Sequence, residues 1–396
     1  MLASKLLEMQ DPEPIRFLDK NGEWNPSESA AVYAIALEGV TLDDKQQWFS
    51  DMSVTRAFDA ECTNLQRQGQ MALWVPSLGQ EGCQVGFAHA ADERDYIFPA
   101  YREHALAYAR GVELYDIGKT FRGISHGGWD PHDPKNGNVH PYTLVLGAQA
   151  HHAVGYSLGQ MLTEKAKHGD YSLDPGTPGT ATDRATIVFY GDGTTSQGDA
   201  NESMVFAASY QTPTLFIVQN NQWAISVPVA RQSRTPIYRR ALGFGINAVQ
   251  IDGNDPLAAY AVAKTMLGMA RGGGGPQYIE ALTYRIGAHT TSDDPTRYRD
   301  SVELDEWRLS DPVNRLAAHL RAAGVGEEFF EQVTQTAREK AQQVREKLLA
   351  SVAPHPDTMF AHAYASAPHA LRDEQRRWMA EYEESYQTDV SGEERV

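Results

Sequence analysis

An aspartate stands between two glycines directly after an apolar run near the middle of the chain. The run ATIVFY (185–190) is typical of a buried strand, and GDGTTSQGD follows it at once. A helical pattern, ANESMVFAASY, and a second apolar run, TLFIVQ (214–219), come next and predict a right-handed strand–helix–strand unit. Asn220 and Asn221 follow the second run. Because ligands of open parallel sheets bind beyond the carboxyl ends of the strands, we expect Asp192 and this pair to lie close together.

The oxygen atoms gathered at this edge suit a hard cation. Carboxylate, amide and main-chain carbonyl oxygens are ligands that magnesium accepts while keeping positions for phosphate oxygens. We therefore expect Asp192, Asn221 and the carbonyl of Trp223 to bind magnesium, and the amides of Gly193 and Thr194, ahead of the helix, to bind a phosphate. The alternative is a tight turn in which the aspartate caps a helix, and the tripeptide Gly-Asp-Gly taken alone favours this alternative. The preceding strand, and the 26 residues between GDG and the asparagine pair, favour the ligand site.

The surrounding pattern predicts the fold class. Between about residues 84 and 285, short apolar runs alternate with helical patterns; the runs include TLVL (143–146), ATIVFY, TLFIVQ and QYIEALTY (277–284). Such alternation is typical of an α/β fold with a mostly parallel sheet and helices on both faces. We expect all four runs to be strands.

The chain is predicted to have three parts. Residues 1–40 mix polar residues and prolines with isolated apolar pieces and are interpreted as an N-terminal arm; residues 41–310 hold the α/β domain. Residues 311–396 are predicted to be a helical C-terminal extension, where Asp311 caps a helix and Pro312 fits its first turn. A second helix there is expected to bury one stripe, which comprises Phe330, Val333, Ala337, Ala341, Val344 and Leu348.

Composition limits the class of protein. With 396 residues, 41% of them hydrophobic, the chain has enough apolar side chains for a substantial core. Its formal net charge of −17 argues against nucleic acid or an anionic membrane as partner. No apolar run approaches the roughly 18 residues that span a bilayer, and we expect a cytoplasmic protein. Cys62 and Cys83 are interpreted as two reduced, packed thiols.

Three separated motifs are similar to those of one enzyme family. They are FPAYREH (98–104), GDGTTSQGDANESMVFAASYQTPTLFIVQNNQWAISVP (191–228) and YRIGAHTTSDDPTRYR (284–299). GDG followed by Asn-Asn is the thiamine diphosphate motif. Over roughly residues 40 to 350, the chain resembles the alpha subunit of the decarboxylating component of two-chain 2-oxo acid dehydrogenase complexes. The resemblance implies the thiamine diphosphate-binding fold, with thiamine diphosphate and magnesium as cofactors.

The resemblance implies roles for four further residues. Tyr101 and Arg102 are implied to hold the diphosphate, which agrees with the paired donors of a guanidinium and the single donor of a phenol. Leu146 is implied to lie under the bent cofactor. His289 is implied to donate to a cofactor phosphate or to the bound intermediate, and we expect it to titrate near the working pH. The polar segment after it resembles the family's flexible active-site loop.

Some positions bear on partners or depart from the family. Gly155 and Gly159, one helical turn apart, resemble the family's close-packed subunit contact, and helix packing within one chain is the alternative. Gln219 stands where certain members carry a phosphate-binding arginine, and Ala100 replaces a polar residue, so diphosphate binding is expected to depend more on the arginine of YREH. Thr290 stands where mitochondrial members carry a regulatory phosphoserine, which argues against kinase control.

The implied activity is oxidative decarboxylation of a 2-oxo acid, with the acyl group passed to a lipoyl group of an acyltransferase core. Family members take one catalytic glutamate from a beta subunit, so the resemblance implies two alpha and two beta chains. The segments EPIRFLDKNGEW (13–24) and NLQRQGQMALW (64–74) favour a branched-chain substrate such as 3-methyl-2-oxobutanoate over the alternatives, pyruvate or acetoin dehydrogenase. A non-catalytic regulatory scaffold is the alternative from another class, and the intact ligand residues argue against it. A dinucleotide-binding oxidoreductase would need a Gly-x-Gly-x-x-Gly turn, which the sequence lacks.

Overall fold

A parallel β-sheet forms the centre of the protein. The computed structural model describes residues 11–125, 127–173, 179–352, 354, 358, 364–366 and 368–390. Within them, five parallel strands pair in the order β1-β2-β3-β7-β6. Their bounds are β1 (Tyr96–Phe98), β2 (Thr186–Gly191), β3 (Thr214–Asn220), β7 (Gln277–Leu282) and β6 (Asn247–Asp252).

The strands β1, β2, β3 and β7 bury both of their faces, whereas the edge strand β6 is only partly buried. In β2, Ile187 and Phe189 belong to one hydrophobic core, whereas Val188 and Tyr190 belong to a second core on the opposite face of the sheet. Successive strand side chains point to opposite faces, so a strand covered on both sides reads as a continuous apolar run. The predicted α/β class with helices on both faces is thus confirmed.

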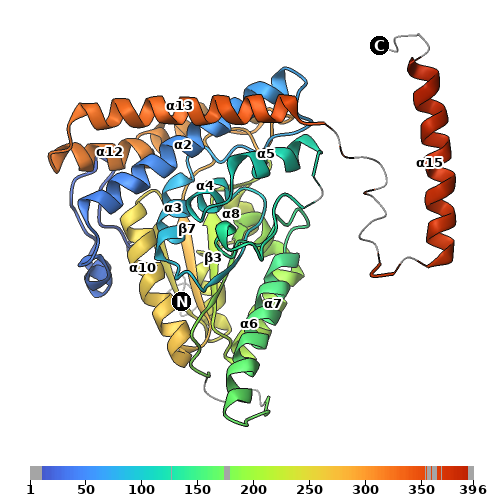
Figure 1. Ribbon diagram of the computed structural model, residues 1–396. Coiled ribbons are helices and arrows are strands. Elements are labelled where there is room, and N and C mark those ends of the chain that lie inside the picture. The colour runs from blue at the N-terminus through green and yellow to red at the C-terminus, as the bar shows by residue number, and fades with distance from the viewer. Residues whose placement is uncertain are drawn as a thin grey trace.

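The helices divide between the two faces and a C-terminal layer. In Figure 1, α10 lies on one side of the sheet and α6 and α7 lie on the other, while α13 crosses α2. The described α-helices are α2 (Leu42–Arg67), α3 (Glu81–Ala90), α4 (His104–Ala109), α5 (Leu114–Arg122), α6 (Ala148–Lys167), α7 (Gly198–Tyr210), α8 (Val229–Gln232), α9 (Tyr238–Gly243), α10 (Pro256–Met269), α11 (Ser301–Arg308), α12 (Pro312–Ala322), α13 (Glu327–Ala350) and α15 (His369–Val390). Short helices η1 (Glu28–Leu37), η2 (Pro134–Asn136), η3 (Asp192–Ser196), η4 (Ala270–Gly274) and η5 (Pro295–Arg297) lie between them, and β4 (Trp223–Ala224) pairs with β5 (Val227–Pro228).

One strand prediction was wrong, and two strands of the parallel sheet were missed. The run TLVL is a loop in which Leu144 and Val145 are 63% and 72% exposed. Pro141, just before this run, lacks the backbone N–H that pairing with a neighbouring strand requires. Gly147, just after it, has a φ of 95° and turns the chain into α6. The sequence prediction omitted β1, which is three residues long, and β6, whose sequence NAVQID lacks an unbroken apolar run.

The C-terminal helices follow their predicted pattern. Asp311 caps α12 by accepting a hydrogen bond from the amide of Asn314, and Pro312 occupies the first turn. The six residues predicted as the apolar stripe of α13 are its buried residues. The stripe packs chiefly on α2, and this layer covers the helices that flank the sheet.

The described part of the N-terminal arm lies against β6 and the start of α10. Ile15 forms a bridge with Ile251, and the buried carboxylate of Asp255 accepts hydrogen bonds from the amides of Phe17 and Leu18. The arm therefore shares the main core. Among the described helices, none combines the length and apolarity needed to cross a membrane.

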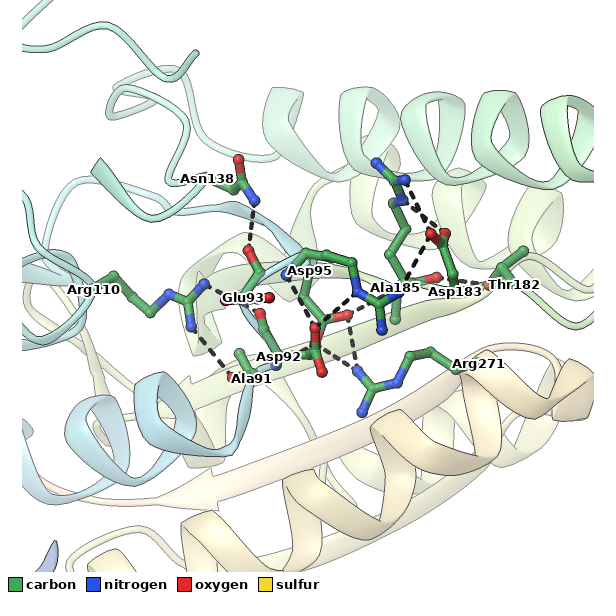
Figure 2. Close-up of polar contacts among 12 residues, drawn as sticks. Ala91, Asp92, Glu93, Asp95, Arg110, Asn138, Thr182, Asp183, Ala185 and Arg271 are labelled. Carbon is green, nitrogen blue, oxygen red and sulfur yellow. Dashed lines mark hydrogen bonds and ion pairs between the residues drawn. The ribbon is translucent and has the colours of Figure 1, made fainter. Parts of the chain in front are cut away.

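A buried carboxylate ties the amino ends of the strands together. Asp95 is fully buried just before β1, and its carboxylate accepts hydrogen bonds from the guanidinium of Arg271 at 2.6 and 2.8 Å. The same carboxylate accepts from the amides of Ala185, before β2, and of Asp92 (Figure 2). The starts of two neighbouring strands and the end of the α10 segment are thus joined through Asp95.

Candidate functional site

A cavity of about 560 Å³ opens at the carboxyl edge of the sheet. It is lined from β2, β3, the segment after β1 and the loop after β7. All nine site residues expected from the sequence line this one cavity: Tyr101, Arg102, Leu146, Asp192, Gly193, Thr194, Asn221, Trp223 and His289. The structure therefore brings together residues from five separate stretches of the chain.

The sheet register places the expected metal ligands side by side. Gly191 pairs with Gln219, so Asp192 and Asn221 leave neighbouring strands at nearly the same level. The Asp192 side chain is almost fully buried, and its Oδ2 accepts a hydrogen bond from Gln232 Nε2 at 2.7 Å. Burial raises the pKa of Asp192 to about 6, because the charged form loses water. A cation at this carboxylate would offset that cost.

The other two expected ligands are held by hydrogen bonds to neighbouring groups. The amide Nδ2 of Asn221 donates to Gln80 Oε1 at 3.1 Å, and its Oδ1 accepts from the amide of Trp223 at 3.3 Å, which leaves one lone pair of Oδ1 for a cation. The carbonyl of Trp223 accepts a hydrogen bond from Arg285 Nη1 at 3.1 Å and keeps one lone pair. In the described part of the chain, no group of three or more His, Cys, Asp or Glu side chains could hold a metal. A mixed set of carboxylate, amide and carbonyl oxygens is the kind that suits magnesium.

Gly193 is required by close packing at the cavity wall. A Cβ built on Gly193 would lie 2.8 Å from the Cβ of Ala224, closer than two carbon atoms approach. The lack of a side chain lets the backbone of η3 lie directly against the β4 segment. Gly193 and Thr194 lie in the wall of the cavity, where peptide amides could bind a phosphate.

Arg102 and His289 are bonded to each other in this state. The guanidinium of Arg102 is buried; its Nη1 donates to the carbonyl of Pro76, and its Nη2 donates to Nδ1 and the carbonyl oxygen of His289 at 3.2 and 3.0 Å. Burial and the neighbouring charge of Arg102 lower the pKa of His289 to about 3. With Nδ1 accepting, the neutral ring carries its proton on Nε2.

The expectation that His289 titrates near the working pH was therefore wrong for this state. The sequence shows a histidine in a polar loop but gives no sign that two arginines, Arg102 and Arg285, lie close enough to oppose its protonation. The loop itself is held in place, since Asp293 accepts hydrogen bonds from the amide of His289 and the hydroxyl of Tyr298. A neutral imidazole with a donor at Nε2 is still able to serve the donor role expected of it.

A row of buried polar side chains beside the cavity was not expected from the sequence. Gln84 Nε2 donates to Gln219 Oε1 at 3.0 Å, and Gln219 Nε2 donates to Glu103 Oε1 at 2.5 Å. Glu103 lines the cavity directly after Arg102, and burial raises its pKa to about 7. The available signal was the place of Glu103 inside the motif YREH, directly after Arg102.

Apolar residues also line the cavity. Leu146 is 40% exposed at the start of α6 and faces the cavity, as does the neighbouring Leu144. Leu73, Val75 and Phe121 line the same cavity. The site thus combines polar, hydrogen-bonding side chains with apolar ones.

Comparison with known proteins agrees with this geometry. A family model described as Dehydrogenase E1 component matches residues 50–356, and the chain belongs to this family. The resemblance stated from the sequence is thereby confirmed. Membership implies a 2-oxo acid dehydrogenase that depends on thiamine diphosphate.

Individual relatives cover most of the chain. The 3-methyl-2-oxobutanoate dehydrogenase subunit alpha of Mycobacterium tuberculosis is 38% identical over 342 residues, which make up 86% of this chain and 88% of that protein. The pyruvate dehydrogenase E1 component subunit alpha of Bacillus subtilis is 34% identical over 342 residues, or 86% of this chain and 87% of that protein. The pyruvate dehydrogenase E1 component subunit alpha of Acholeplasma laidlawii is 36% identical over 267 residues, which make up 67% of this chain and 72% of that protein.

Proposed function

We propose that this chain is the alpha subunit of a branched-chain 2-oxo acid dehydrogenase that uses thiamine diphosphate and magnesium. The observation that carries the proposal is the convergence of all nine expected site residues on one cavity at the carboxyl edge of the sheet. The relative named for 3-methyl-2-oxobutanoate, at 38% identity, supports the branched-chain substrate. The apolar wall of the cavity supports an aliphatic side chain on the substrate.

The residues present fit the cofactor. Asp192, Asn221 Oδ1 and the carbonyl of Trp223 would hold magnesium, and the amides of Gly193 and Thr194 would face the diphosphate. Thiamine diphosphate, when bound, supplies the electron sink that allows a 2-oxo acid to lose carbon dioxide. The close packing of the Gly193 backbone on Ala224 supports a site for a phosphate, and the burial of the Asp192 carboxylate, which disfavours its charged form, supports a site for a cation.

Arg102, Tyr101 and His289 would act around that group. The Arg102 guanidinium would bind diphosphate oxygens through its paired donors, with Tyr101 adding one hydroxyl. His289 holds its proton on Nε2 while Arg102 occupies Nδ1, so it would donate from Nε2 to an oxygen of the bound ligand. Leu146 would support the cofactor through its apolar side chain.

A beta subunit would complete the site. Leu144 and Ile225, both lining the cavity, are 63% and 54% exposed, and large exposed apolar side chains at a cavity mouth favour a covering partner. On α6, a Cβ built on Gly155 or Gly159 would meet nothing within 4 Å, so packing within this chain does not account for these glycines. We propose a beta chain on this face, in an assembly of two alpha and two beta chains that delivers acyl groups to a lipoyl-bearing core.

The test is an assay of the assembled protein. The chain would be co-expressed with the beta subunit encoded beside it, and carbon dioxide release would be measured with 3-methyl-2-oxobutanoate and with pyruvate. We expect a higher kcat/KM with the branched substrate, dependence on thiamine diphosphate and magnesium, and no activity from the chain alone. A higher kcat/KM with pyruvate would replace the substrate assignment, and inactivity of a stable complex with both would refute the proposed function.

A further inference from the structure

Gln80 occupies a rigid turn beside the cavity. The preceding residue, Gly79, has a φ of 95°, and a Cβ there would lie 2.5 Å from Ile286 Cγ1 and 2.6 Å from the carbonyl oxygen of Tyr284. The hydroxyl of Thr283 also donates to the carbonyl of Gly79 at 2.9 Å. The turn is thus pressed against the chain that continues from β7. The backbone of Gln80 is therefore placed by the sheet, and its side chain has little freedom to move away.

The Gln80 side chain is buried and only half satisfied. It is 1% exposed and lines the cavity. Its Oε1 accepts the hydrogen bond from Asn221 Nδ2 at 3.1 Å. Its Nε2 is buried without a hydrogen-bond partner among the described residues. A buried donor left without an acceptor is unfavourable, so such a group in a ligand cavity indicates that a ligand supplies the acceptor.

The position of the free donor indicates the chemistry of that ligand. An amide N–H has no acceptor capacity and cannot bind a cation, so it needs an oxygen from outside the chain. The same cavity contains Arg102, the amides after Asp192, and Asn221, all of which we assign to magnesium and diphosphate. A diphosphate oxygen is an acceptor that can reach a donor next to the metal ligands, because magnesium and diphosphate bind as one unit.

We infer that Gln80 positions the metal ligand Asn221 through its Oε1 and binds a diphosphate oxygen of the cofactor through its Nε2. This inference rests on the proposed function. By accepting from Asn221 Nδ2, Gln80 turns the other end of that amide, Oδ1, toward the cation. One side chain thereby serves both charges of the magnesium–diphosphate unit.

The test compares two substitutions that separate these roles. Gln80→Met removes both the acceptor and the donor, whereas Gln80→Glu keeps an acceptor for Asn221 and replaces the donor with a negative charge. Gln277→Met is the matched control. Gln277 is also 1% exposed and its side-chain amide also donates hydrogen bonds, but it lies at the amino end of β7, away from the end that faces the cavity. The measurements are calorimetric titrations of the assembled alpha–beta protein with thiamine diphosphate at saturating magnesium, and with magnesium at saturating thiamine diphosphate.

The two variants should differ in their magnesium dependence. We expect Gln80→Met to weaken thiamine diphosphate binding by about ten- to a hundredfold, the effect of losing a hydrogen bond to a charged group, and to raise the magnesium midpoint. We expect Gln80→Glu to weaken thiamine diphosphate binding at least as much without raising the magnesium midpoint. Gln277→Met should change neither value.

The possible failures are distinguishable. If the unsubstituted protein does not bind thiamine diphosphate, the proposed function itself fails. If the unsubstituted protein binds thiamine diphosphate and both Gln80 variants bind it with the same affinity as the unsubstituted protein, the inference is overturned while the proposed function stands. Wild-type thiamine diphosphate affinity in Gln80→Glu alone overturns the donor assignment. Should Gln80→Met not fold, as thermal unfolding would show, Gln80→Glu decides the question, since it is close to isosteric and keeps the bond to Asn221.

Discussion

Replacing Glu103 with glutamine should reduce the pH dependence of the free energy of unfolding. Glu103 is 2% exposed; its carboxylate accepts from Gln219 Nε2 and from the amide of Arg102, while the Arg102 guanidinium is turned to Pro76 and His289. Burial raises its pKa from the ordinary 4.5 to about 7. The folded protein therefore keeps a proton that the unfolded chain has lost at intermediate pH, and the free energy of unfolding falls as pH rises from about 4.5 to about 7.

The size of the effect follows from the pKa difference. A difference of about 2.5 pKa units at 1.36 kcal/mol per unit gives about 3 kcal/mol over the full range, of which about 2–3 kcal/mol falls between about pH 5 and about pH 8. Glu103→Gln keeps an oxygen that accepts from Gln219 and cannot ionise. We expect the wild type to lose about 2–3 kcal/mol more than this variant on going from about pH 5 to about pH 8.

Denaturant unfolding of both proteins across this pH range measures the difference. Other buried carboxyl groups, such as Asp59 and Asp192, occur in both proteins and cancel in the comparison. Glu331→Gln, an exposed position on α13, is a control that removes the same charge from the surface. Parallel curves for the wild type and Glu103→Gln would refute the reasoning. We also expect thiamine diphosphate affinity of the wild type to fall above about pH 7, since the ionised carboxylate then repels the diphosphate, and to fall less in Glu103→Gln.

Three further substitutions test the cavity. Asp192→Ala should abolish magnesium-dependent binding of thiamine diphosphate and leave the fold intact, as judged by calorimetry and circular dichroism; unchanged affinity in the assembled complex would remove the residue from the metal site. His289→Ala should lower kcat by about 10²- to 10⁴-fold with a much smaller change in cofactor affinity, and wild-type turnover would remove it from the mechanism. Gly193→Ala should weaken cofactor binding because its Cβ meets that of Ala224, and adding Ala224→Gly should restore binding; a double variant as weak as the single one would contradict the steric explanation.

The sequence predicted the parts of the site that depend on local order along the chain. Asp192 and Asn221 each follow a long apolar run, and parallel strands end at one edge, so their meeting could be inferred before any coordinates. The stripe of α13 was predictable for the same kind of reason, since a helix buries residues at a fixed spacing. The prediction for TLVL failed because an apolar run of four residues has the same pattern in a strand and in an exposed loop.

Contacts between distant segments were beyond the reach of the sequence. Arg102 and His289 are separated by 187 positions along the chain, and only the fold shows that they share a hydrogen bond and that burial and the charge of Arg102 lower the pKa of the imidazole. Gln80 carried no signal of its own, because its unsatisfied amide exists only once the turn at Gly79 is packed on the chain after β7. Titration behaviour and hydrogen-bond satisfaction depend on such packing.

The carboxylate of Asp95 aligns two neighbouring strands at their amino ends. It joins the beginnings of β1 and β2, whereas Arg102 and Asp192 follow the far ends of the same strands. Each strand then acts as a spacer that advances about 3.3 Å per residue and reverses the direction of the side chain at every step. One inserted residue in β1 would reverse the faces of the strand residues that follow it and move the start of the segment that carries Arg102 by about 3.3 Å. The number of residues in each strand therefore sets the distance between the two edges of the sheet.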